Sequence, residues 1–140
     1  MLLPVRYLES SAVVAALLER DLAARASLRA AGRRVTSVLT VAETARAIIR
    51  ARVAGRLSTA QERAAVRALR VFERRTDLVA VTAAILARVE RPFPIEPIRT
   101  LDAIHLATAD ILGESPQLVT IVTRDDRVRG NARALAYAVE

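Results

Sequence analysis

Short, mostly apolar runs alternate along this chain with longer segments whose apolar residues recur at helical spacing. Four such runs lie at residues 5–8, 35–38, 78–81 and 118–122 and are rich in Val, Leu and Ile. Their shortness and mostly apolar character predict strands, and those at residues 5–8 and 118–122 are expected to be buried, because strands covered on both faces lack polar alternation. A shorter run at residues 137–139 is expected to form an edge strand.

The segments between these runs have the periodicity and end signals of helices. We predict helices at residues 12–18, 22–31, 40–54, 59–75, 82–90, 100–112 and 131–135. Ser10 or Ser11 would cap the first helix, and Gly32 and Gly55 would end the second and third. Three prolines between residues 92 and 97 predict a loop.

Strands that alternate with helices favour a parallel sheet covered by helices on both faces. The 140 residues match the size of one domain, and we see no repeat or linker that would divide residues 1–140. The predicted fold class is therefore a single α/β domain with a mainly parallel central sheet. In such sheets a ligand crevice lies outside the carboxyl ends of the strands.

The composition restricts the chemistry of any metal site. Apolar residues make up 53% of the chain but aromatic residues only 3%, so Ala, Val, Leu and Ile must build the core. Cysteine is absent, which excludes disulfides and thiolate metal sites. A metal would bind carboxylate oxygens or the single histidine, and oxygen ligands favour Mg²⁺ or Mn²⁺.

The net charge is +7, and all 22 basic residues are arginine. Arginine matches the geometry of phosphate groups, so one interpretation is a phosphate-rich partner. The other is a GC-rich genome that favours Arg and Ala codons, and the two are compatible. No apolar run approaches the ~20 residues that a membrane span requires. The first five residues lack the features of a signal peptide, so we expect a cytoplasmic location.

Four acidic residues lie where the ligand crevice is expected. Glu9 follows the first strand, Asp125 follows the strand at residues 118–122, and Glu43 and Asp102 fall in the first turns of two predicted helices. Carboxylates that converge repel one another unless a cation neutralises them. Two metal ions held by such groups would clamp a phosphodiester and activate a water molecule.

Each of these acids also has a purely structural interpretation. Glu43 fits a capping box that begins at Thr40, and the helix dipole would favour Asp102 close behind Thr100. Asp125 and its neighbour Asp126 are typical of a turn, and Glu9 fits a solvated strand end. Sequence spacing alone leaves these alternatives open.

Other polar residues stand near these acids in the sequence. Ser11 and Thr123 could orient a ligand carboxylate or a water, or could serve as helix-cap and strand-end donors. His105 lies three residues after Asp102 on nearly the same helical face, where it would contact substrate or pack against a neighbouring helix. We interpret Asp110 as a surface residue.

Two groups of arginines are candidates for contacts with phosphate. Arg63, Arg67, Arg70 and Arg74 form one helical stripe, which would follow an RNA backbone or be a solvated face. Arg124, Arg127 and Arg129 surround Asp125 and are the better candidates for substrate binding. There is no aromatic interleaving, glycine-rich phosphate loop or nucleophile elbow.

Four short motifs of this chain resemble, in order, those of the PIN-domain ribonucleases, and in particular the VapC-type toxins of bacterial toxin–antitoxin systems. They are YLESSA at residues 7–12, TVAE at 40–43, LDAIHLATA at 101–109 and VTRD at 122–125. The third motif is the most specific, and the four together span essentially the whole chain. The resemblance implies a ribonuclease with a magnesium-type site, usually dimeric and inhibited by a cognate antitoxin.

One position departs from the family pattern, because Glu9 stands where the family has aspartate. The extra methylene would move the carboxylate by ~1.5 Å, whereas metal–ligand distances are held to within about 0.2 Å. Reduced activity is therefore part of the expectation.

Together these observations predict a metal-dependent endoribonuclease that uses a metal-activated water. Glu9, Asp102 and Asp125 would hold Mg²⁺ or Mn²⁺, and Glu43 would hold a metal or its water. RNA, a cognate antitoxin and a second copy of the chain are the expected partners. The alternative is a catalytically weakened domain that binds RNA or an antitoxin peptide.

Overall fold

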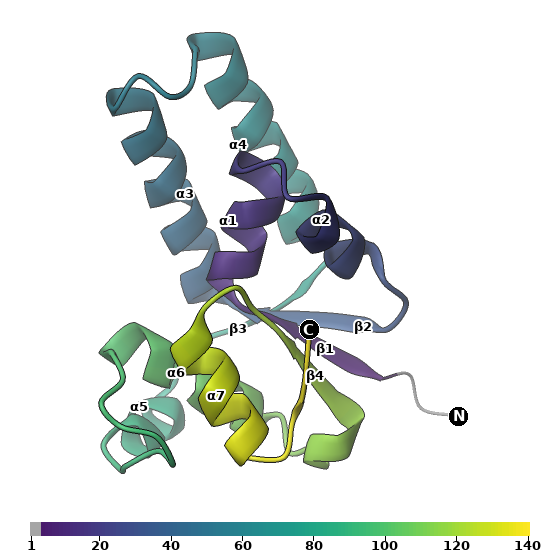
Figure 1. Ribbon diagram of the computed structural model, residues 1–140, viewed down its shortest axis with the longest axis vertical. Coiled ribbons are helices and arrows are strands. Elements are labelled where there is room, and N and C mark those ends of the chain that lie inside the picture. Colours follow the sequence, from purple (N-terminus) through teal and green to yellow (C-terminus); the bar gives the residue numbers. More distant parts are fainter. Residues whose placement is uncertain (1–3) are drawn as a thin grey trace.

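The computed structural model describes residues 4–140, which form a five-stranded parallel sheet with helices on both faces (Figure 1). The strand order is β3-β2-β1-β4-β5. The strands are β1 (Val5–Leu8), β2 (Arg33–Ser37), β3 (Asp77–Val79), β4 (Val119–Val122) and β5 (Ala138–Val139). Each adjacent pair is parallel, so the predicted single α/β domain with a parallel sheet is confirmed.

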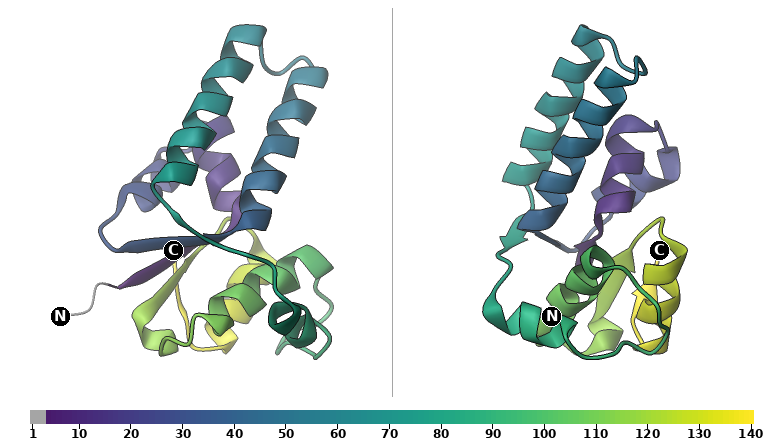
Figure 2. Two further views of the ribbon diagram at one scale, coloured as in Figure 1. Left: turned by 180° about the vertical axis from the view of Figure 1, so that it is seen from behind. Right: turned by 90° about the vertical axis from the view of Figure 1, so that its left-hand side faces the viewer.

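Within residues 4–140, helices cover both faces of the sheet (Figures 1 and 2). On the first face lie α1 (Ser10–Leu18), α2 (Leu22–Arg29), α3 (Val38–Val53) and α4 (Thr59–Arg74). On the second lie α5 (Ala83–Val89), α6 (Thr100–Ile111) and α7 (Asp126–Ala134). A short 3₁₀ turn, Pro116–Leu118, precedes β4. No helix within residues 4–140 is long and apolar enough to cross a membrane.

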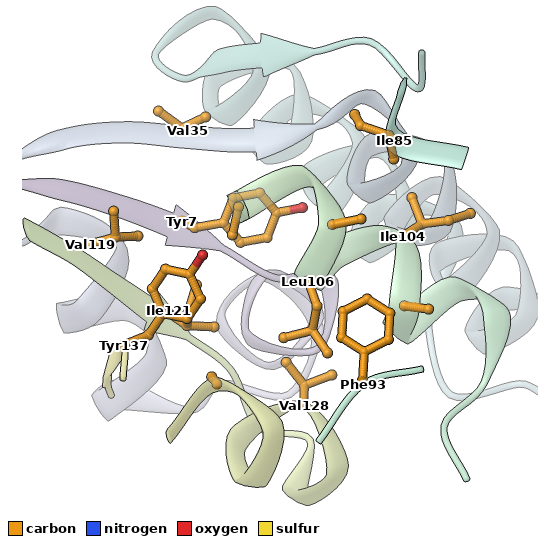
Figure 3. Packing of buried hydrophobic residues seen from close by; sticks show 14 of the residues in the cluster. Tyr7, Val35, Ile85, Phe93, Ile104, Leu106, Val119, Ile121, Val128 and Tyr137 are labelled. Carbon is orange, nitrogen blue, oxygen red and sulfur yellow. The ribbon is translucent and has the colours of Figure 1, made fainter. Parts of the chain in front are cut away.

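The sheet separates two hydrophobic cores. Because neighbouring strand residues point to opposite faces, Leu8 and Val122 pack against α1–α4, whereas Tyr7 and Ile121 pack against α5–α7. Figure 3 shows the second core, in which Tyr7 lies next to side chains from β2, β4 and α6. The alternation of β1 and β4 thus builds both cores, and the carboxyl ends of these strands meet at one edge of the sheet.

Two helices begin earlier than their predicted starts because a different residue caps them. Glu9 caps α1 by accepting a hydrogen bond from the Ser11 amide, so neither Ser10 nor Ser11 is the cap. Ser37 caps α3, which starts at Val38 rather than Thr40. The capping box proposed for Thr40 and Glu43 is therefore wrong, and Glu43 lies in the second turn of its helix.

The last helix is the largest departure from the prediction. α7 runs from Asp126 to Ala134, five residues before the predicted start at residue 131. Asp125 caps it by accepting from the amides of Arg127 and Val128 at 2.9 and 3.0 Å. The Asp125–Asp126 pair therefore starts a helix rather than making an isolated turn.

We expect Gly32→Ala to destabilise the fold more than Gly55→Ala. Both glycines have positive φ, +137° and +75°. A Cβ on Gly32 would lie 2.8 Å from the Pro4 carbonyl oxygen, whereas no described atom beyond its chain neighbours lies within 4 Å of one on Gly55. An alanine at position 55 would adopt the positive φ at a cost of about 1–2 kcal/mol. At position 32 the positive φ has a cost of similar kind, and the clash with the Pro4 carbonyl oxygen adds to it. Urea unfolding measures both, and equal losses of unfolding free energy would contradict the close approach.

Candidate functional site

A hollow of about 420 Å³ opens at the edge of the sheet where β1 and β4 end, and we call it the acidic pocket. Its lining comprises Glu9, Ser10, Ser11, Val14, Glu19, Glu43, Ala47, Arg50, Arg99, Asp102, Arg124 and Asp125. All four acids singled out in the sequence are among these residues. They come from the β1–α1 junction, α3, α6 and the β4–α7 junction. The fold thus brings them into one pocket from segments far apart in the sequence.

The Glu9 carboxylate is buried and surrounded by donors. Ser10 Oγ donates to Oε1 at 2.9 Å, and the Ser11 amide and Thr123 Oγ1 donate to Oε2 at 3.1 and 2.8 Å. The Ser11 hydroxyl also donates to Oε2. These hydrogen bonds offset the desolvation of a side chain that is only 3% exposed. The longer glutamate is accommodated because it turns back to cap α1.

Glu43 is joined to a buried histidine. His105 Nε2 lies 2.7 Å from Glu43 Oε1, and His105 Nδ1 lies 2.7 Å from the Tyr7 hydroxyl. His105 is 1% exposed and does not line the acidic pocket, so it packs inside the protein and is not placed to contact substrate. Burial raises the pKa of Tyr7 far above its ordinary value, and the charges of Glu9 and Glu43 add to the increase. The Tyr7 hydroxyl therefore keeps its proton.

Asp102 and Asp125 share a single guanidinium group. Arg99 Nε donates to Asp102 Oδ2 at 3.2 Å, and its NH2 group donates to Asp125 Oδ2 at 3.3 Å. The hydrogen bond to Asp102 is the main reason that the pKa of Arg99 is raised, and the charges of Asp125 and Glu43 add to it. The side chain of Arg99 is 67% exposed, whereas that of Asp102 is 7% exposed. Arg99 thus balances the charges of Asp102 and Asp125 from the solvent side of the pocket.

Ser11 and Thr123 lie beside the carboxylates and connect the start of α1, next to Glu9, to the loop that carries Asp125. Thr123 Oγ1, which donates to Glu9, also accepts from the Asp125 amide at 3.0 Å. Ser11 Oγ accepts from the Arg124 amide at 2.8 Å. These contacts fix the start of α1 to the loop before α7, and so fix the positions of Glu9 and Asp125 relative to each other.

The donor set suits a hard divalent cation, although the carboxylates do not surround one point. Among residues 4–140, no three acidic or histidine side chains are close enough to hold a metal ion as they stand. The carboxylates of Glu9, Glu43, Asp102 and Asp125 are satisfied instead by hydroxyls, backbone amides, His105 or Arg99. The lining carries five carboxylates and three guanidinium groups, which leaves an excess of two negative charges. Carboxylate oxygens and this excess charge fit Mg²⁺ or Mn²⁺, provided that Arg99 withdraws.

Of the arginines chosen in the sequence for substrate binding, Arg124 lines the acidic pocket, whereas Arg127 and Arg129 do not. Arg124 donates through Nε to Asp21 at 3.0 Å. Arg129 donates instead to the Thr123 carbonyl at 2.8 Å. The stripe formed by Arg63, Arg67, Arg70 and Arg74 is an exposed face of α4 outside the pocket.

Sequence reasoning missed Arg50 and Arg99, both of which line the acidic pocket. Helical spacing would have indicated them. Arg50 lies two turns after Glu43 on α3, and Arg99 lies three residues before Asp102 at the start of α6. Asp110, by contrast, is exposed further along α6, as expected.

Comparison with known proteins agrees with the resemblance in the motifs. The family model of the PIN domain matches residues 6–134. Ribonuclease VapC46 of Mycobacterium tuberculosis is 39% identical over 140 residues, which cover 95% of this chain and 94% of that protein. Ribonuclease VapC35 of the same species is 41% identical over 56 residues, or 40% of this chain.

Two solved structures show the same fold at low sequence identity. The crystal structure of VapBC2 from Rickettsia felis, bound to a DNA fragment from their promoter, has a TM-score of 0.65, 13% identity and 97% coverage of both chains. The structure of VapBC-1 from nontypeable Haemophilus influenzae has a TM-score of 0.60 and 17% identity, and covers 97% of this chain and 96% of that one. The family match includes the four acids singled out in the sequence, and the relative aligned over nearly the whole chain is named a VapC ribonuclease. The chain therefore belongs to the PIN-domain family.

Proposed function

We propose that this protein is a metal-dependent endoribonuclease, the toxin of a toxin–antitoxin pair, which hydrolyses RNA phosphodiester bonds in the acidic pocket. The observation that carries the proposal is that four carboxylates from four separate segments line one pocket of a PIN-domain chain. The extensive similarity to a protein named ribonuclease VapC46 supports RNA as the substrate.

Glu9, Glu43, Asp102 and Asp125 and the two hydroxyl residues next to them each have a definable task in this proposal. Glu9, Asp102 and Asp125 would hold Mg²⁺ or Mn²⁺, and Glu43 would hold a metal or its water. When bound, the cation supplies Lewis acidity and lowers the pKa of a coordinated water. Ser11 and Thr123 keep the Glu9 carboxylate oriented through their hydroxyls.

Arg99 has two tasks in succession. In the structure it balances Asp102 and Asp125. A cation held by Asp102 and Asp125 would take over that role and would leave the exposed Arg99 guanidinium free at the rim of the pocket. There it can bind a phosphate oxygen together with Arg50 and Arg124, which also line the pocket.

Replacement of Asp102 tests the assignment of the pocket. Asp102→Asn keeps the size of the side chain but removes its charge, so cleavage of RNA with added Mn²⁺ should fall by about 100-fold or more. The matched control is Asp110→Asn on the same helix, where the side chain is exposed and outside the pocket. The control should cleave like the native protein.

The same assay distinguishes the nuclease from the alternative, a module that binds RNA without cleaving it. A binding module is favoured by one observation, namely that protein donors already occupy both oxygens of Glu9. If the native chain binds RNA but does not cleave it with either Mg²⁺ or Mn²⁺, the nuclease proposal fails. Equal activity of Asp102→Asn and Asp110→Asn would move the active site elsewhere.

Glu9→Asp should increase metal-dependent cleavage, by roughly 10-fold. The shorter side chain can still cap α1 but draws back from Thr123, which frees a carboxylate lone pair toward the pocket. Glu19→Asp is the control, because Glu19 is exposed at the rim of the same pocket. Initial cleavage rates measure both variants. Slower cleavage by Glu9→Asp would mean that this site is adapted to glutamate.

An antitoxin is the second partner in the proposal, because both similar solved structures are named as VapBC proteins. A groove of about 380 Å³ between α1, α2 and α4 offers a surface for it. The lining combines apolar side chains with four arginines, namely Arg25, Arg29, Arg34 and Arg75. These charges fit an acidic, partly apolar segment of the antitoxin.

We also expect the protein to be a homodimer. Large apolar side chains remain exposed on α3 and α5, including Val53 at 82%, Leu86 at 47% and Ile49 at 43%. Burial of such groups between two copies would remove apolar surface from water. Light scattering at micromolar concentration should give the mass of two chains, and the mass of one chain would contradict the expectation.

A further inference from the structure

A chain of hydrogen bonds leads from the core of the protein to the acidic pocket. It begins at Tyr7 on β1, whose hydroxyl points towards α6 in Figure 3. The hydroxyl oxygen lies 2.7 Å from His105 Nδ1, and His105 Nε2 lies 2.7 Å from Glu43 Oε1. Tyr7 and His105 are each 1% exposed, whereas the Glu43 side chain is 25% exposed and lines the pocket.

The chemistry of the Tyr7, His105 and Glu43 side chains determines which group donates and which accepts in these hydrogen bonds. An ionised Glu43 carboxylate can only accept a hydrogen bond, so Nε2 must carry a proton. A neutral imidazole then has an unprotonated Nδ1, which accepts from the Tyr7 hydroxyl. Ser10 Oγ, 3.4 Å from Nε2, already donates to Glu9 Oε1 and cannot donate to the ring as well. Tyr7 and Glu43 therefore favour the same tautomer of His105, with the proton on Nε2.

We propose that His105 is a positioning residue, whose Nε2–H tautomer is favoured by both the Tyr7 hydroxyl and Glu43, so that it fixes the Glu43 carboxylate at the rim of the acidic pocket. This inference rests on the proposed function, because it assigns Glu43 a role there. His105 stands one turn from Asp102 on α6, and Glu43 stands on α3. Their hydrogen bond therefore couples two elements that supply carboxylates to the pocket from opposite faces of the sheet.

A purely structural role for His105 would leave a different trace. A buried histidine that only packs needs no defined tautomer. For such a residue, loss of the Tyr7 hydroxyl would change only the free energy of unfolding. A positioning role requires that the Tyr7 hydroxyl act on Nδ1 of the ring and that the cation affinity of the pocket depend on the Nε2 donor.

The tautomer can be measured directly, because His105 is the only histidine of the chain. In a long-range ¹H–¹⁵N spectrum, we expect one protonated ring nitrogen, Nε2, in the native protein. Tyr7→Phe removes the donor to Nδ1, so the Nδ1 resonance should move towards that of an imidazole nitrogen without a hydrogen bond. Tyr137→Phe is the matched control, because the only other tyrosine lies in the same core and has no hydrogen bond to the ring. A native Nδ1–H ring, or identical spectra for Tyr7→Phe and the native protein, would overturn the proposal.

The affinity of the acidic pocket for a cation tests whether the hydrogen bonds from Tyr7 through His105 act on Glu43. His105→Leu removes the donor and should weaken Mn²⁺ binding by about 10-fold, measured by electron paramagnetic resonance. His105→Gln places an amide N–H near the position of Nε2 and should recover part of the loss. Circular dichroism and thermal unfolding establish that both variants are folded.

The possible outcomes separate this inference from the proposed function. If the native protein binds no Mn²⁺, the proposed metal-dependent function fails. If the native protein binds Mn²⁺ and folded His105→Leu binds it equally well, the positioning role fails while the proposed function stands. Equal weakening in folded His105→Gln and His105→Leu also overturns the role of the Nε2 donor.

Discussion

The structure depends on how four carboxylates can share one pocket. Parallel strands bring the ends of β1 and β4 to the same edge of the sheet, and the helices that begin there add further acids. Like charges in one pocket repel and lose hydration, so each must have its own compensation. Hydroxyls and an amide surround Glu9, His105 donates to Glu43, and Arg99 bridges Asp102 and Asp125.

Three consecutive residues, the last two of β1 and the one that follows it, show how closely fold and site are linked. Tyr7 packs into the core under α5–α7 and reaches His105, whereas Leu8 packs into the core under α1–α4. Glu9 follows at the end of the strand, caps α1 and lines the acidic pocket. A shift of β1 by one residue would exchange the two faces and remove both the core packing and the carboxylate. The central strand therefore sets the geometry of the site.

The sequence was sufficient to predict the parallel sheet, the order of the elements and the four acids that meet in the pocket. Period and composition determine these features, because apolar runs must be buried and parallel strands need helical connections. Helix starts were less predictable. They depend on which side chain reaches a free amide, as Glu9, Ser37 and Asp125 do.

The contacts that join the acids to partners in other segments could not be predicted from spacing. Arg99 bridges two carboxylates that are 23 residues apart, and His105 joins α6 to a glutamate 62 residues away. Such contacts depend on the three-dimensional path of the chain, and local patterns carry no information about that path. The Ser11 and Thr123 hydroxyls were expected near the site, but only the fold shows that both contact Glu9.

The most direct test of this account is a crystal structure of the protein soaked in Mn²⁺, with the metal located by its anomalous scattering. The account predicts an anomalous peak in the acidic pocket, bound by Asp102 and Asp125, with the Arg99 guanidinium displaced from between them. An unaltered Arg99 bridge and no anomalous peak in the pocket at saturating Mn²⁺ would contradict it.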